Sequence, residues 1–437
     1  MLTSNGYAKS RMRTVKITQA ECALLLLAVF PFFFGTLIDL LKLPWAIRYF
    51  MDVSWAFLLL LMWIRRYRQN QKGYSVLLLW TTLFFLYAGL TYLVQYQSLM
   101  YYLWGVRNNF RFFVAFFAFA VFLKSEDIHG YFRLFGFLLW INVVATLYQY
   151  FGLGIAGDHL GGIFGTEKGA NGYTNIFFVI MVTRDILLYL EKKENLSNCI
   201  LKCVAMFIVA ALAELKFFFV EYILILVLVV LFTNFTWRKL CVILSGILLI
   251  VVGAAILVTA FPQSEGFLSW DFLLNYALTD KGYTSSGDLN RLNAISKINE
   301  LWLKTSWQRL FGLGLGNCDT ASFDFLNTPF YEAYGTMHYT WISYAMMYLE
   351  CGWIGLIFYF GFFVLVYLSI RRIEKRCSGV ATTYCRMGRI LALMCMIIAI
   401  YNSSLRTEAG YMMYFALSVP FVMRRDQIGA ARRGEKK

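Results

Sequence analysis

The residues of this sequence that could do chemistry stand at the edges of long apolar runs. His338 opens the stretch "HYTWISYAMMYLECGWIGL". Because imidazole titrates near neutral pH, a histidine there could act as a general base or donate a hydrogen bond to an oxyanion. A cap or interface role fits a lone histidine at a helix start equally, so its type alone leaves these roles open.

Two cations also interrupt apolar patterns. Arg291 lies at helical spacing from Ile295, Ile298 and Trp302, so we predict it on the apolar face of a helix. An arginine there needs a partner, which can be a lipid phosphate, a loop carboxylate or a substrate phosphate. Lys216, in "AELKFFF", is a candidate functional residue by its apolar setting, although a local interaction with Glu214 or snorkelling also explains it.

Three further arginines border apolar runs. Arg107 and Arg111 are four residues apart and therefore share one helix face. Two guanidinium groups together suit a pyrophosphate, whereas anchoring at lipid headgroups is the alternative. Arg406 and Glu408 flank a short turn before the last apolar run, where we expect a structural ion pair.

The elements that must position these residues are membrane-spanning helices. The chain has 437 residues, of which 60% are hydrophobic and 15% charged, far from the roughly half apolar and quarter charged composition of soluble proteins. The apolar residues come in runs of about 20, the length that crosses a bilayer. We therefore predict an all-α integral membrane protein, a single polytopic domain over 1–437, with about twelve spans. They are 20–38, 46–64, 74–95, 109–123, 132–151, 172–190, 199–213, 217–233, 240–261, 338–368, 389–405 and 409–423.

Basic residues set the predicted orientation. The net charge of +15 comes mainly from short clusters between apolar runs, such as "RRYRQNQK" and "RRIEKR", which favours membrane orientation over nucleic-acid binding. With the N-terminus inside, the strongly basic loops share one side, so we predict both termini to be cytoplasmic. The polar segment 262–337, between predicted spans nine and ten, then forms a large outer loop. Its part "GDLNRLNAISKINELWLKTSW" predicts an amphipathic helix with Asp288 available as the N-cap.

The sequence offers no pattern for a metal ion or a cofactor. Most of the nine cysteines lie in or beside apolar runs, where a thiol packs as a small hydrophobe. HExxH, GxSxG, a P-loop and a CxxC pair are all missing. The run "GLGLGN" follows no strand of a βαβ unit, so we interpret it as a turn that allows close backbone approach. We expect no cofactor and no metal.

The order of these features resembles the O-antigen polymerase and O-antigen ligase superfamily. The resemblance covers about residues 150–370 and is carried by "NRLNAISKINELW", then "LFGLGLGNCDTASF", then "HYTWISYAMMYLECGWIGL". In that family the outer loop carries an arginine, a glycine-rich turn, and a histidine followed by a glutamate and GxxG. The matching residues here are Arg291, Gly312, Gly314, Gly316, Asn317, His338, Glu350, Gly352 and Gly355.

Two weaker similarities lie upstream. Asn171 ends a glycine-containing loop, as in the family, and Lys216 stands where the family commonly has an arginine. Lysine keeps the charge but loses the bidentate geometry. The family's His-Asn pair is His338-Tyr339 here, so no role of that asparagine carries over.

The resemblance implies a metal-independent glycosyltransferase at the outer face of the bacterial cytoplasmic membrane. It would polymerise polyprenyl-pyrophosphate-linked oligosaccharide into O-antigen, capsule or exopolysaccharide. His338 and Arg291 would be catalytic; Lys216, Arg107, Arg111 and Arg406 would bind the pyrophosphate; Glu350, Gly314, Gly316 and Asn171 would support the site. Membrane lipid, a chain-length regulator and a flippase are the implied partners.

Two alternatives remain open at this point. The first is a ligase that transfers finished glycan to another acceptor, which the sequence separates poorly from a polymerase. The second is a flippase for the lipid-linked sugar. The large asymmetric outer loop and the lack of an obvious internal repeat favour a reaction at the surface over transport.

Overall fold

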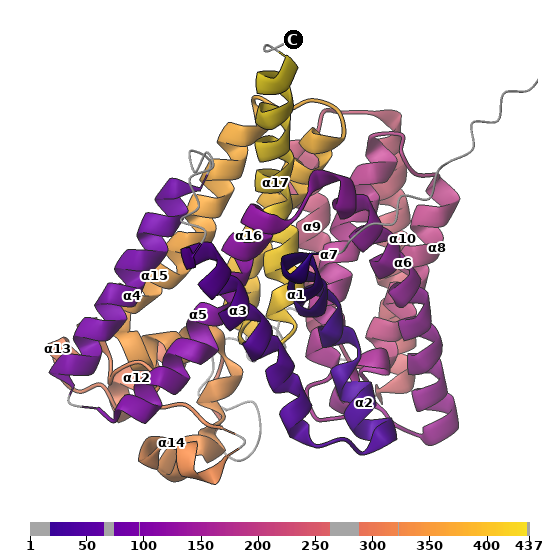
Figure 1. Ribbon diagram of the computed structural model, residues 1–437. Helices are drawn as coiled ribbons and strands as arrows, with labels where there is room; N and C mark the ends of the chain where they lie inside the picture. Colours follow the sequence, from indigo (N-terminus) through magenta and orange to yellow (C-terminus); the bar gives the residue numbers. More distant parts are fainter. Residues whose placement is uncertain (1–17, 65–73, 96, 263–287, 322, 435–437) are drawn as a thin grey trace, which may run out of the picture.

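The computed structural model describes residues 18–64, 74–95, 97–262, 288–321 and 323–434. Within these residues the regular structure is helical (Figure 1). The helices are α1 (Gln19–Val29), α2 (Phe34–Leu41), α3 (Phe50–Ile64), α4 (Ser75–Val94), α5 (Leu99–Phe122), α6 (Ser125–Leu147), α7 (Asn171–Leu190), α8 (Leu196–Leu212), α9 (Lys216–Phe232), α10 (Trp237–Ala260), α12 (Ala294–Leu301), α13 (Ser306–Phe311), α14 (Pro329–Tyr334), α15 (Ser343–Glu374), α16 (Val380–Tyr401) and α17 (Gly410–Gly434).

The long helices give the chain the architecture of a multi-pass membrane protein. In the described part, seven helices are long and apolar enough to cross a membrane, or up to eight if the pair α1 and α2, bent by 59°, forms one span. A helix occupies each of the twelve ranges predicted as spans. Some of these helices are short, however, since α8 and α9 have 17 residues each. The number twelve stays a prediction.

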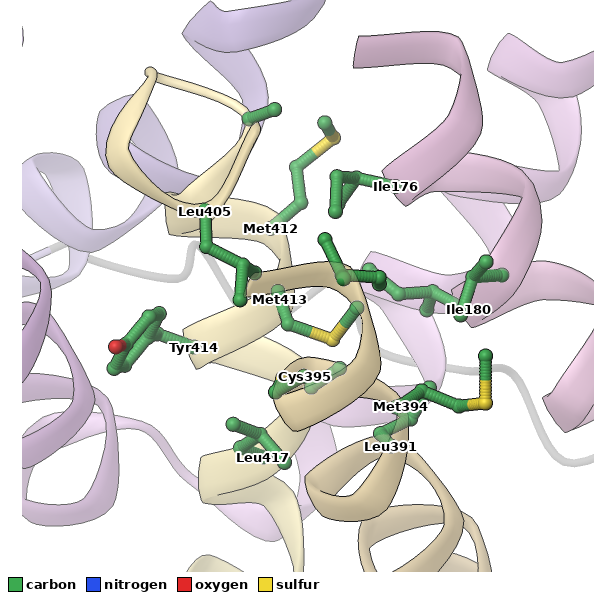
Figure 2. Packing of buried hydrophobic residues seen from close by; sticks show 14 of the residues in the cluster. Ile176, Ile180, Leu391, Met394, Cys395, Leu405, Met412, Met413, Tyr414 and Leu417 are labelled. Atoms are coloured by element: carbon green, nitrogen blue, oxygen red, sulfur yellow. The ribbon is translucent and has the colours of Figure 1, made fainter. Parts of the chain in front are cut away.

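The centre of the bundle contains α7, α16 and α17. The most apolar window of α7 is 83% buried inside the protein, whereas that of α4 at the periphery is 28% buried. Ile176 and Ile180 of α7 lie beside Met394 of α16 and Met413 of α17 in one buried cluster (Figure 2). α7 is buried on nearly all sides, as expected for a central helix, whereas α4 exposes leucines as a lipid-facing helix does.

The connections between helices meet at two ends of the bundle. At one end, Arg386 pairs with Glu191 at 2.6 Å and the backbone N–H of Ser125 bonds to Asp426. At the other, which we call the loop end, the segments 157–170, 213–216, 288–341 and 402–409 come together (Figure 1). The stretch 263–287 of the predicted outer loop lies outside the described residues.

A break in α15 determines how the loop end is built. Gly352 has φ 61° and ψ −162°, which interrupts the helix. The carbonyl oxygens of Leu349 and Glu350 accept hydrogen bonds from the backbone N–H groups of Leu313 and Gly314, at 3.0 and 2.9 Å. The turn that follows α13 thus satisfies carbonyl groups that a broken apolar helix cannot satisfy itself.

The glycines of this turn are packed against the protein's own helices. Gly312, Gly314 and Gly316 all have positive φ, between 73° and 101°. A Cβ on Gly314 would lie 2.0 Å from the side-chain oxygen of Gln97, and one on Gly316 would lie 2.0 Å from the carbonyl oxygen of Tyr101. The predicted close approach of the "GLGLGN" backbone is therefore an approach to other segments of the same chain.

The amphipathic helix predicted within 262–337 is present as α12, but it begins later than the pattern indicated. Asn293 is its N-cap and makes no side-chain capping bond, so the proposed capping role of Asp288 is wrong. Arg291 lies in the turn before the helix, so its expected place on the apolar face is also wrong. Both residues have tertiary partners instead.

Replacing Gly352 with alanine should destabilise the protein. The new Cβ would lie 2.3 Å from the carbonyl oxygen of Leu310, in addition to the strain of positive φ. Gly379→Ala is the matched control, because Gly379 has φ 63° but open space around its Cβ position. We expect G352A to lose about 1–3 kcal/mol more unfolding free energy than G379A, measured on purified protein in detergent. Equal losses would show that the approach of α13 does not matter.

Candidate functional site

His338 lies just before α15, between two short 3₁₀ turns, with φ 53° and ψ 27°. Its Nδ1 is 2.6 Å from Oδ1 of Asp288, and its ring stacks on Trp341 with centroids 3.8 Å apart. Within the described residues only Nδ1 of this ring is hydrogen-bonded. The His338 side chain is 33% exposed, whereas that of Asp288 is 2% exposed. Asp288 therefore holds the Nδ1 edge of the imidazole and Trp341 covers one face of the ring, while part of the ring is exposed at the surface.

Arg291 follows Asp288 by three residues, and its side chain is held by Tyr401. Its Nε donates to the carbonyl oxygen of Tyr401 at 2.6 Å, and its guanidinium lies 4.3 Å from the centroid of the Tyr401 ring. The hydroxyl of Tyr344 donates to the Arg291 carbonyl. The backbone N–H of Leu289 bonds to the Met337 carbonyl at 3.2 Å. The segments that carry Arg291 and His338 are thus joined to each other.

Lys216 starts α9 and forms an ion pair with Glu214 at 2.8 Å, both side chains being about one quarter exposed. The local interaction with Glu214 considered from the sequence is therefore present. The next residue, Phe217, stacks on the Tyr401 ring with centroids 3.6 Å apart. Tyr401 thus contacts both Arg291 and the first turn of α9.

The glycine-containing loop before α7 approaches the same place. Asn171 donates to Oδ1 of Asp158 at 3.0 Å and to the carbonyl of Ala213 at 3.1 Å, so it ties this loop to the turn between α8 and α9. Lys168 extends over Trp341, with its Nζ 4.9 Å from the ring centroid. The structure therefore adds a cation near His338 that the sequence analysis did not select.

Arg107 and Arg111 lie in a separate group of ion pairs. Arg107 bonds to Asp52 through Nε and a terminal nitrogen, at 3.1 and 2.6 Å. Arg111 pairs with Glu408 at 3.0 Å and approaches Asp52 at 3.6 Å. The prediction that the two arginines share a face is confirmed, since both reach the same carboxylates.

Arg406 extends this group, which we call the ion-pair network: Asp52, Arg107, Arg111, Asp319, Arg406 and Glu408. Arg406 pairs with Asp319 at 3.1 Å, and Arg111 takes Glu408, so the expected Arg406–Glu408 pair is wrong. Three cations face three carboxylates here. Their role in binding a pyrophosphate stays a prediction, while their geometry favours a structural role.

The charge of Glu408 is stabilised by arginines of this network and by Arg48. Burial alone would raise the pKa of Glu408, but the positive charges of Arg111, Arg48 and Arg107 outweigh burial and lower it to about 2. The hydroxyl of Tyr173, which donates to Oε2 at 2.8 Å, acts in the same direction. Glu408 is therefore an ionised, buried carboxylate at neutral pH.

Glu350 and Gly314 join the glycine turn to α15, and Gly316 packs against Tyr101 of α5. Glu350 is fully buried and its carboxylate accepts a hydrogen bond from the backbone N–H of Cys318 at 3.2 Å. Together with the backbone bond between Gly314 and Glu350, it fixes the glycine turn on α15.

The most informative residue that the sequence did not assign to the site is Asp288. It lies 50 positions from His338, and the local pattern favoured a capping role for it, so only the tertiary structure brings the two together. In the described residues, no group of three or more His, Cys, Asp or Glu could hold a metal ion. The side chains that this site brings together are an imidazole, cations and a carboxylate.

Removing the charge of Glu408 should destabilise the protein more than removing an exposed carboxylate. We expect Glu408→Gln to cost about 3–5 kcal/mol, because it removes the carboxylate 3.0 Å from the buried Arg111 and leaves Asp52, at 3.6 Å, to balance both arginines. Glu300→Gln is the control, since Glu300 is 63% exposed and pairs with Lys297 at 3.0 Å, a contact worth about 0–1 kcal/mol. Unfolding in detergent measures both.

We also predict that the destabilisation caused by Glu408→Gln depends on pH. The folded pKa of Glu408, about 2, lies below the value of roughly 4.3 for an unfolded glutamate. The contribution of the Glu408 charge to the unfolding free energy is therefore complete above about pH 4.3, and it is lost as the pH falls toward 2. The stability difference between the parent protein and E408Q should narrow over this range, and a constant difference would contradict the assigned ion pairs.

Comparison with known proteins identified no relative from which the role of the site could be inferred. No protein-family model matches the chain, and no curated protein matches it. The family resemblance stays a prediction, and the functional interpretation depends on the residues at the loop end.

Proposed function

We propose that this protein is a membrane glycosyltransferase that polymerises polyprenyl-pyrophosphate-linked oligosaccharide into a surface polysaccharide. One observation carries the proposal: His338 and Arg291 are on two segments hydrogen-bonded to each other at one end of a multi-pass bundle. A histidine and a fixed arginine on joined segments suit a reaction in which a hydroxyl loses its proton while an anion departs.

In the proposed reaction, a sugar hydroxyl of the acceptor attacks the anomeric carbon of the donor glycan. The new glycosidic C–O bond forms, and the bond between the anomeric carbon and the pyrophosphate oxygen breaks. The hydroxyl proton passes to Nε2 of His338. The polyprenyl pyrophosphate leaves with the electron pair, and Arg291 and Lys216 stabilise its negative charge.

The placement of charge supports the orientation that we propose. We assign the loop end to the outer face of the bacterial cytoplasmic membrane, with twelve spans and both termini cytoplasmic. Arg371 and Arg372 end α15 away from the loop end, as expected for a helix that enters the cytoplasm there. Lipid headgroups at the outer face would place a lipid-linked pyrophosphate at the depth of Arg291 and Lys216.

His338→Ala and Arg291→Ala should abolish chain extension while the protein stays folded in the membrane. The first variant removes the base and the second removes a charge that stabilises the leaving group. The assay is extension of a purified lipid-linked repeat unit in detergent, read as product length by gel or mass spectrometry. Because detergent leaves no membrane to cross, activity there excludes a flippase.

The controls use residues of the same type in similar local contacts. His159 bonds through Nδ1 to the carbonyl of Thr166, and Arg309 donates from Nε to the carbonyl of Leu303. Alanine at either position should leave extension unchanged. Wild-type product lengths from H338A or R291A would overturn the role of that residue, and transfer of finished glycan without extension would identify a ligase.

Lys216→Arg should retain extension, and Lys216→Ala should lose most of it. Arginine keeps the positive charge beside Phe217 and Glu214, whereas alanine removes it. The same extension assay distinguishes the two variants. Full activity of K216A would remove Lys216 from the site.

A further inference from the structure

We infer that Asp288 is a positioning residue for His338: it holds the imidazole with Nδ1 as the hydrogen-bond donor and so leaves Nε2 as the nitrogen that accepts a proton. This inference deepens the proposed function and rests on it for its kinetic test. A separate spectroscopic test of the tautomer does not depend on activity.

The geometry fixes the tautomer. An ionised carboxylate can only accept hydrogen bonds, so the nitrogen 2.6 Å from Oδ1 of Asp288 must carry the proton. In a neutral imidazole the other nitrogen then has the free electron pair. Asp288 is 2% exposed, so water competes little for this bond, whereas His338 is 33% exposed and can meet a substrate.

The orientation of the ring is fixed by two further contacts and by the backbone conformation of His338. Trp341 stacks on the imidazole, and the backbone bond from Leu289 to Met337 joins the two segments directly beside the pair. The φ of 53° at His338 is an uncommon conformation for a residue with a side chain. Such a backbone persists where its surroundings enforce it, which is typical of functional sites.

Among the described residues, the charged groups that we consider around His338 come from two segments. Asp288 approaches from the segment before α12, Lys168 approaches across Trp341 from the loop before α7, and Arg291 follows Asp288 by three residues. Lys168 lies over Trp341 and Arg291 is bound to Tyr401, so we expect both cations to stay in place when Asp288 is changed. A change in pH dependence on substituting Asp288 therefore reports the loss of its negative charge.

The first experiment compares Asp288→Asn and Asp288→Glu with the parent in the extension assay. Asparagine can present its amide N–H to Nδ1 and favour the wrong tautomer, so we expect kcat to fall by roughly 100-fold or more with KM nearly unchanged. The acidic limb of the pH–rate profile should move to lower pH, because the imidazolium loses its neighbouring negative charge. D288E should recover part of kcat and return the limb toward its original position.

The second experiment observes the tautomer directly. The chain has three histidines, His129, His159 and His338, so ¹⁵N-histidine NMR spectra are simple, and His338→Gln assigns the signal. We expect a protonated Nδ1 and an unprotonated Nε2 at His338 in the parent. The opposite tautomer in the parent would overturn the inference, whatever the stability of the Asp288 variants.

The outcomes separate the inference from the proposed function. Asp127→Asn, in the first turn of α6 at the opposite end, is the control for the substitution itself. A parent protein that extends no glycan would refute the proposed function and leave the tautomer test to decide the role of Asp288. An active parent, with D288N retaining the parent kcat or an unmoved acidic limb, would refute the positioning role alone.

Discussion

The break of α15 at Gly352 is the constraint on which the loop end depends. An apolar helix cannot leave carbonyl groups without partners away from water, so each break requires hydrogen-bond donors from elsewhere. Here the N–H groups of Leu313 and Gly314 and the hydroxyl of Tyr87 supply them. The glycine turn is therefore held on α15 by necessity, and the loop-end segment that precedes α15 starts from a rigid attachment.

From that attachment, tyrosines at the start of α15 position the rest of the segment. The hydroxyl of Tyr339 donates to the carbonyl of Cys318, that of Tyr344 to the carbonyl of Arg291, and that of Tyr348 to the side chain of Asn299. Tyr344 and Tyr348 are four residues apart on one helix face, so they hold α12 and the turn before it along α15. The place of Arg291 follows from these bonds together with its contact to Tyr401.

The parts of this structure that depend on local pattern could be predicted from the sequence. Apolar runs of membrane length gave the positions of the long helices, and the spacing of Arg107 and Arg111 gave their shared face. Contacts between distant segments could not be predicted. Asp288 looked like an N-cap because capping is a local property, yet its partner is 50 residues away. The glycines of "GLGLGN" predicted a turn whose backbone is closely approached. Their spacing could not predict whether a ligand or α15 makes that approach.

The cations at the loop end differ in their neighbouring residues. This difference distinguishes the ion-pair network, which we interpret as structural, from the candidate site around His338. In the ion-pair network, the buried Glu408 and Asp319 and the partly buried Asp52 pair with Arg111, Arg406 and Arg107, and removing one carboxylate would leave largely buried positive charge less well compensated. Such a network holds α3, α5 and the turn before α17 in one arrangement. Around His338, by contrast, the buried carboxylate of Asp288 is directed at the imidazole and Lys168 lies over Trp341. Lys216 and its partner Glu214 are both about one quarter exposed, unlike the buried Glu408 of the network. In the proposed enzyme the network thus supplies rigidity, and the surroundings of His338 supply the chemistry.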